Sequence, residues 1–85
     1  MKRCRHDIVA DILRALASLT PKNVNRLALE ANLSHRRARI LLETMALRGL
    51  VQKDEEGRYV ITSRGFEWLR LYELLVEMYD PPALS

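Results

Sequence analysis

Residues 34–39 place a serine, a histidine and three arginines where a helix is expected to begin. They read Ser34-His35-Arg36-Arg37-Ala38-Arg39 and lead into a leucine-rich stretch. Positive charge in a first turn opposes the helix macrodipole, which favours acids there. A phosphate backbone outside the helix would compensate, and a guanidinium binds both phosphate and guanine edges through paired hydrogen bonds. We therefore predict DNA contacts from Ser34, His35, Arg36, Arg37 and Arg39.

Within this cluster the roles are expected to differ. We assign Arg36 and Arg39 to the groove, and Ser34 and Arg37 to phosphates. The plainest alternative is that the arginines only form a solvated helix face.

Two further sets of cations are candidates for the same partner. Lys2, Arg3 and Arg5 begin the chain and, as a flexible arm, could follow the backbone or enter a minor groove. A disordered charged tail explains them equally well. Lys53 and Arg58 flank the turn Asp54-Glu55-Glu56-Gly57, whose acidic tip opposes contact with phosphates.

Catalysis and metal binding find little support in the sequence. No Ser, His and Asp stand at a suggestive spacing, and no glycine-rich phosphate loop is present, since the three glycines are assigned to caps and turns. Cys4 and His6 supply only two ligands, whereas a structural zinc site has four. We predict no enzyme, no cofactor and no metal.

Length and charge limit the class of protein. Eighty-five residues make one domain, 1–85, with a net charge of +3. The first 48 residues carry ten Lys/Arg and four Asp/Glu, while the last 37 carry four and seven. One cysteine excludes an internal disulfide and fits a reducing interior. The apolar runs are too short for a membrane span, so we expect a cytoplasmic, nucleoid-associated protein without membrane contact.

The hydrophobic spacing predicts helices over about 7–19, 23–31, 34–48 and 64–80. Asn23 and Ser34 are expected N-caps, and Gly49 is the expected C-terminal glycine of the third helix. Two short strands, 50–53 and 59–62, form a hairpin around Gly57. The fold class is mostly α with a small β-hairpin. It is a winged helix-turn-helix, with a three-helix core and wing over 7–62 and a dimerisation helix over 63–80.

The last helix carries more apolar surface than one domain can cover. Ten of the fourteen residues from 66 to 79 are apolar, and exposed patches of that size usually mark an interface. We predict a homodimer through this helix, although it could instead close one face of a monomeric core. The expected interface residues are Trp68, Leu71, Tyr72, Leu75, Met78 and Tyr79.

Residues 8 to about 80 resemble the small archaeal winged-helix DNA-binding proteins, a group of transcriptional regulators and crenarchaeal chromatin proteins. The resemblance rests on the turn ANLS (31–34), the exit GLV (49–51) and the return YVITSRG (59–65). It implies that the third helix recognises DNA and that the last helix pairs two subunits. The family's wings usually have basic tips, and this one departs from that pattern.

The prediction is a double-stranded DNA-binding protein, most simply a transcriptional regulator, that inserts its third helix into the major groove as a homodimer. Two alternatives stay open. One is a winged-helix protein–protein interaction module, and the other is a non-specific architectural chromatin protein.

Overall fold

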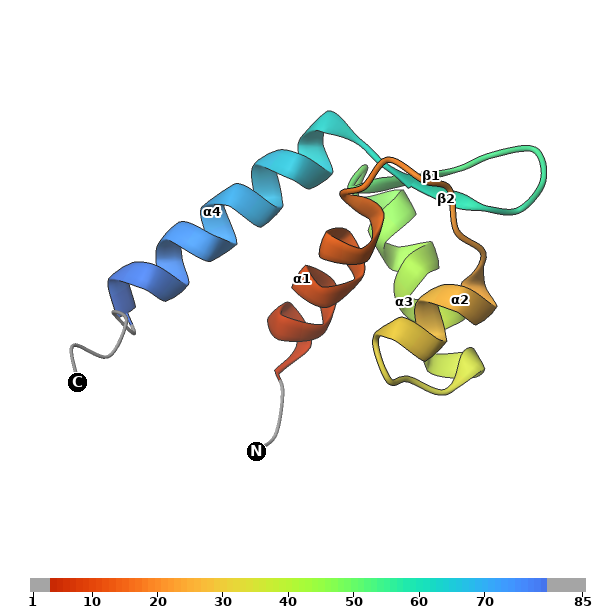
Figure 1. Ribbon diagram of the computed structural model, residues 1–85, viewed down its shortest axis with the longest axis horizontal. Coiled ribbons are helices and arrows are strands. Elements are labelled where there is room, and N and C mark those ends of the chain that lie inside the picture. The colour runs from red at the N-terminus through yellow and green to blue at the C-terminus, as the bar shows by residue number, and fades with distance from the viewer. Residues whose placement is uncertain (1–3, 80–85) are drawn as a thin grey trace.

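The computed structural model describes residues 4–79 and contains four helices and one hairpin. Their bounds are α1 Arg5–Leu16, α2 Val24–Glu30, α3 His35–Leu47, β1 Val51–Lys53, β2 Tyr59–Ile61 and α4 Ser63–Tyr79. Helix α1 lies between α4 on one side and the α2–α3 pair on the other (Figure 1). This arrangement confirms the predicted fold class, a mostly helical winged helix-turn-helix with a small hairpin.

Helix α1 is displaced from its predicted bounds of 7–19. It begins earlier because the Cys4 backbone N–H donates to the Asp7 carboxylate, 3.2 Å away, and so closes a capping interaction. It ends earlier because the backbone turns left-handed at Leu19, with φ +67°. Leu19 was counted in the apolar stripe, yet its side chain is 69% exposed. Arg5 was expected in a flexible arm, and it is instead the first residue of α1.

Both caps predicted for the helix-turn-helix are confirmed. The Asn23 side chain accepts the N–H of Arg26 at 2.8 Å, and the Ser34 hydroxyl accepts the N–H of Arg37 at 3.2 Å. Between the helices, Asn32 adopts a left-handed φ of +56°, a conformation that asparagine tolerates. The turn is therefore tight, and the start of α3 is fixed by its own sequence.

Helix α3 ends at the predicted glycine and passes directly into the wing. Gly49 has φ +79°, and the N–H groups of Gly49 and Leu50 donate to the carbonyls of Ala46 and Met45. This is the Schellman pattern of a helix C-terminus. The hairpin pairs Val51 with Ile61 and Lys53 with Tyr59.

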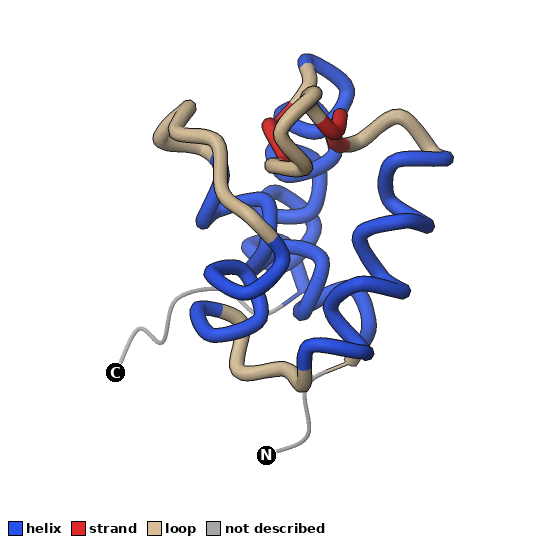
Figure 2. The backbone as a smooth tube through the Cα atoms, turned by 90° about the vertical axis from the view of Figure 1, so that its right-hand side faces the viewer, coloured by secondary structure: helices blue, strands red, loops and turns tan. Residues whose placement is uncertain are grey.

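The hairpin has an unpredicted third partner. Lys22, in the connection between α1 and α2, exchanges both backbone hydrogen bonds with Tyr59, at 3.1 and 2.8 Å. This pairing covers one side of β2. Figure 2 shows both strands together at the end of the helical body opposite the N-terminus.

The junction between α3, the wing and α4 is organised by Thr62. Its hydroxyl lies 2.6 Å from the carbonyl oxygen of Gly49 and accepts the N–H of Gly65 at 3.0 Å. Gly65 was assigned to a cap or turn, and that prediction was wrong because it lies buried inside the first turn of α4. A Cβ at Gly65 would stand 2.3 Å from the carbonyl oxygen of Leu50 and 2.8 Å from Ile61. Only glycine permits this close approach.

The core lies between α1, α2, α3, the wing and the first half of α4. Its members are apolar, and no polar or charged residue of the described chain is buried with them. The fully buried large side chains are those of Ile12, Leu13, Leu16, Leu27, Leu42, Met45 and Tyr59. None of the helices within residues 4–79 has the length and apolar character needed to cross a membrane.

Helix α4 changes its environment along its length. Trp68 and Tyr72 pack partly against the core and stack on each other, with ring centroids 5.5 Å apart. His6 of α1 also stacks on Trp68, with ring centroids 6.2 Å apart. The distal half of α4 then leads away from the body (Figure 1). The remaining predicted interface residues are exposed there: Leu71 51%, Leu75 65%, Met78 80% and Tyr79 89%.

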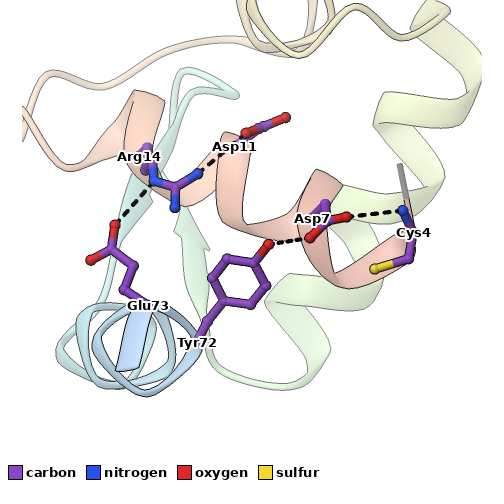
Figure 3. Close-up of polar contacts among 6 residues, drawn as sticks. All are labelled: Cys4, Asp7, Asp11, Arg14, Tyr72 and Glu73. Atoms are coloured by element: carbon purple, nitrogen blue, oxygen red, sulfur yellow. Dashed lines mark hydrogen bonds and ion pairs between the residues drawn. The ribbon is translucent and has the colours of Figure 1, made fainter. Parts of the chain in front are cut away.

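Polar contacts between α1 and α4 fix how the two helices lie against each other (Figure 3). The Tyr72 hydroxyl donates to the Asp7 carboxylate. At the next residue of α4, Glu73 accepts a hydrogen bond from Arg14 Nε at 3.1 Å. The Arg14 guanidinium also lies over the Tyr72 ring, 5.8 Å from its centroid, which is cation–π geometry.

The Asp7–Tyr72 hydrogen bond moves both pKa values in the directions that a bond to a carboxylate requires. The Tyr72 hydroxyl, followed by the Cys4 N–H, lowers the pKa of Asp7 below its usual value. The same bond raises the pKa of Tyr72 to about 12. The contact therefore stabilises the fold while Asp7 is ionised and Tyr72 is protonated.

We predict that Tyr72→Phe lowers the melting temperature at neutral pH, because Asp7 loses a hydrogen bond. The stabilisation from Asp7 is present above its ordinary pKa and is lost as the pH falls through the lowered value. The deficit of Tyr72→Phe should therefore shrink on acidification from about pH 7 to about pH 3. Thermal unfolding followed by circular dichroism at several pH values measures this.

Tyr79→Phe is the matched control, because Tyr79 lies on the same helix but is exposed. It should melt like the unaltered chain at every pH. A deficit for Tyr72→Phe that stays constant down to about pH 3 would contradict the assigned role of Asp7.

Candidate nucleic-acid interface

Helix α3 is amphipathic, and its burial fixes which side chains point outward. Ala38, Leu42 and Met45 are buried against the rest of the domain. The side chains on the other faces are exposed at all five positions predicted to contact DNA, Ser34, His35, Arg36, Arg37 and Arg39. The rotation of α3 therefore presents the cationic cluster to solvent as one surface.

The cations of the described chain divide into two groups according to their ion pairs. Six have a carboxylate within 4.0 Å: Arg14, Lys22, Arg26, Arg39, Arg58 and Arg70. Six have no such partner among residues 4–79: Arg5, Arg36, Arg37, Arg48, Lys53 and Arg64. The second group is the one whose charge is available to an external anion.

The α3 cluster is the densest part of the unpaired group. Arg36 and Arg37 are adjacent, and neither is neutralised within the described chain. Arg39 reaches Glu43 at 3.7 Å, and both side chains are about half exposed, so this pair is weak and solvent-screened. Glu43 is the one acid of α3, and it lies a full turn beyond the cluster.

Several charged side chains of the wing pair with one another. The Asp54 carboxylate accepts the backbone N–H groups of Arg58 and Glu56, at 2.8 and 2.9 Å. The bond from the Arg58 N–H is the main reason why the pKa of Asp54 lies below its usual value. The Arg58 guanidinium then bonds Asp54 and Glu56 at 3.3 and 2.6 Å. Arg58, predicted to contact DNA, is thus already held by two acids of the same turn.

Lys53 is less constrained than Arg58. Its ammonium lies 5.9 Å from the centre of the Tyr59 ring, in cation–π geometry. Tyr59 itself is buried, and burial raises the pKa of its hydroxyl. Lys53 can therefore still offer its charge outward, whereas the exposed Glu55 at the tip repels phosphates.

A groove joins the N-terminal cations to α3. Arg5, from the first turn of α1, and Arg37, from the first turn of α3, line the same groove. The sequence separates these residues by 32 positions, so their proximity follows only from the fold. Lys2 and Arg3, the other predicted members of the N-terminal set, lie outside the described residues.

Two unpaired arginines near the wing were missed by the sequence analysis. Arg48 is the C-cap residue of α3, and Arg64 lies in the first turn of α4. The Arg64 side chain lies 3.5 Å from the point that a Cβ on Gly49 would occupy. It therefore lies beside the end of α3. No local pattern predicts that Arg64 lies here, because the Thr62 junction is what brings the start of α4 beside the end of α3.

The described residues form no metal-ligand cluster at this surface. Within residues 4–79 no three His, Cys, Asp or Glu side chains gather closely enough to hold a metal ion. What α3 presents is a set of hydrogen-bond donors and positive charges, which suits the acceptor-rich phosphates and base edges of a nucleic acid.

A family model for the winged helix-turn-helix matches residues 2–80. The chain belongs to this family. Two solved structures from Sulfolobus solfataricus have a similar fold. One is Sso10a-2, described as a DNA-binding protein, with 20% identity and a TM-score of 0.76, and the match covers 92% of this chain and 83% of that one.

The other similar structure is the transcriptional regulator BldR, with 21% identity and a TM-score of 0.66. The match covers 92% of this winged helix-turn-helix chain but only 63% of BldR. At these identities the likeness establishes the fold. No curated protein sequence matches the chain.

We predict that Ser34→Ala destabilises the domain by about 1 kcal/mol, because the N–H of Arg37 loses its cap. Ser34→Asp should keep nearly full stability, because aspartate caps equally well and its charge suits the N-terminus of a helix. Urea denaturation followed by circular dichroism measures both. Equal stability of the alanine variant and the unaltered chain would show that the Ser34 bond contributes nothing.

Proposed function

We propose that this protein binds double-stranded DNA through α3 and acts as a transcriptional regulator, with a binding role and no catalytic step. The observation that carries the proposal is the unpaired cationic face of α3 on a winged helix-turn-helix. In this fold the second helix of the motif enters the major groove and its N-terminal residues meet the base edges. Arg36 and Arg39 are assigned to base edges, and Ser34 and Arg37 to phosphates.

The surroundings of α3 support the same assignment. Arg5 and Lys53 flank the helix from α1 and from the wing, and both lack a carboxylate partner in the described chain. His35, beside Arg36, adds a further donor. The two similar folds are described as a DNA-binding protein and a transcriptional regulator, which agrees with the proposal.

We further propose that two copies associate through the distal half of α4. Leu71, Leu75 and Met78 are exposed on this half, and exposed apolar surface of this kind is stabilised by burial against a partner. A two-fold axis through α4 would give two copies of α3, which could read half-sites about 34 Å apart. Trp68 and Tyr72, also predicted at the interface, would contribute only the edges left free by α1.

The acidic tip of the wing favours one other candidate function. Glu55 is exposed there and would suit a basic protein partner, as in a winged-helix interaction module. An architectural chromatin protein would use the same α3 surface as a regulator but bind all sequences equally. Sequence dependence therefore separates the two DNA-binding roles.

The first test is DNA binding by fluorescence anisotropy with a duplex of mixed sequence across a salt series. Affinity should fall steeply with salt, with a log–log slope of about −0.9 for each phosphate contacted. Arg36→Ala and Arg39→Ala should each cost about 1–3 kcal/mol and relax the preference for guanine-containing sites. An equal loss on all sequences would make these residues phosphate anchors.

Arg70→Ala provides the matched control, because Arg70 is exposed on α4 and paired with Glu67 at 2.5 Å. It should leave DNA affinity unchanged. Absence of binding by the unaltered chain even at low salt would refute the DNA-binding proposal and favour the protein-interaction module.

The dimer is tested by light scattering after size exclusion at micromolar concentration. The unaltered chain should have twice the monomer mass of 9.9 kDa, and Leu75→Glu should be monomeric because a buried carboxylate opposes association. Leu29→Glu is the control, since Leu29 is also exposed but lies on α2, and it should remain dimeric. A monomeric unaltered chain would remove this part of the proposal.

A further inference from the structure

The groove between α1 and the recognition helix has the size of a small-molecule site. It measures about 460 Å³, and ligand pockets typically span about 300–1,000 Å³. Its walls come from the first turn of α1, from the turn before α3, and from α3 between Arg37 and Thr44. The lining residues are Arg5, Ile8, Leu33, Arg37, Ile40, Leu41 and Thr44.

The charged residues that line this groove are all positive. Arg5 and Arg37 are its two ionisable lining residues, and neither has a carboxylate partner in the described chain. Thr44 is the third polar side chain, and its hydroxyl donates to the Ile40 carbonyl at 3.1 Å. The groove therefore offers two guanidinium groups and no acid, so the complementary ligand is an anion.

The floor of the groove is apolar and partly exposed. Ile40 is 50% exposed, and Ile8, Leu33 and Leu41 are partly buried against the core. A bare phosphate or sulfate would satisfy the arginines and leave this floor in water. An anion that carries an apolar body would cover both, and burial of the floor would add to its affinity.

We propose that this groove binds a small amphipathic anion, with an aromatic or aliphatic body on the floor and a carboxylate between Arg5 and Arg37. The predicted effect of this ligand on DNA binding rests on the proposed function. Arg37 is assigned to a DNA phosphate, and its guanidinium cannot serve a bound carboxylate and that phosphate together. Ligand and DNA therefore compete, and the anion acts as a releasing effector.

The probe for the site is 2-naphthoate, measured by isothermal titration calorimetry on the full chain, with 2-naphthamide as its uncharged counterpart. Naphthoate should bind, and naphthamide should bind at least about tenfold more weakly, because a hydrogen bond to a charged group is lost. Arg5→Gln and Arg37→Gln should each weaken naphthoate by about the same factor.

Two variants keep the site assignment falsifiable. Arg48→Gln removes an unpaired arginine that does not line the groove, and it should leave naphthoate affinity unchanged. His6→Gln alters a second groove, between α1 and α4, which is lined by Cys4, His6, Trp68, Leu71, Tyr72 and Leu75, and it too should have no effect. Circular dichroism confirms that each variant is folded before it is titrated.

Competition is read from the DNA anisotropy assay with naphthoate added. At constant ionic strength the apparent Kd for DNA should rise linearly with naphthoate concentration, whereas naphthamide should be at least about tenfold less effective and sodium acetate should leave the Kd unchanged. In Arg5→Gln, about tenfold more naphthoate should be needed for the same release.

Each outcome decides a separate part of the inference. No naphthoate binding up to millimolar concentration, or binding insensitive to both arginine variants, overturns the site. Binding at the site without release of DNA overturns the competition. If naphthoate binds as described but the chain fails to bind DNA at any salt concentration, the site stands and the proposed function fails.

Discussion

The arrangement of this molecule depends on the junction at Thr62, where the end of α3, the wing and the start of α4 meet. One hydroxyl lies 2.6 Å from the Gly49 carbonyl oxygen and accepts the Gly65 N–H, so it ties the C-terminus of α3 to the N-terminus of α4. The missing side chain of Gly65 lets α4 approach the backbone of Leu50 and the side chain of Ile61. Because α3 is already held by its buried stripe, this junction fixes the direction in which both the wing and α4 depart.

Helix α1 lies between α3 and α4. One of its sides packs on α2 and α3, and the other meets α4 through Asp7–Tyr72 and Arg14–Glu73 (Figure 3). Helix α3 and the distal half of α4 therefore lie on opposite sides of α1 (Figure 1). A second copy could cover α4 without hiding α3, so self-association and nucleic-acid binding are geometrically compatible.

Ion pairing within the chain, more than its composition, determines which charged side chains are available to an external anion. The chain contains 14 Lys and Arg against 11 Asp and Glu, a modest excess. A carboxylate lies within 4.0 Å of Arg58 in the wing and of Arg14, Lys22, Arg26, Arg39 and Arg70 on the helices. The first turn of α3 keeps its charge because no acid is within reach of Arg36 or Arg37 in the described chain. A small net charge is thereby concentrated on one surface, where an anion would meet it.

The sequence by itself determined the features that depend on short-range contacts. The caps at Asn23 and Ser34, the glycine end of α3 and the hairpin turn all follow from residues within a few positions of one another, and the structure confirms them. The family and the fold class followed from their order. Only the tertiary structure decided that α1 ends early and that Gly65 lies buried inside α4. It also decided that Arg58 pairs with acids of its own wing and that Trp68 and Tyr72 pack partly against α1. The position of Arg5 and Arg37 on one groove likewise follows only from the fold. These features join residues far apart in the chain or depend on which of several possible partners lies nearest, and periodicity and local propensity contain no information about such distances.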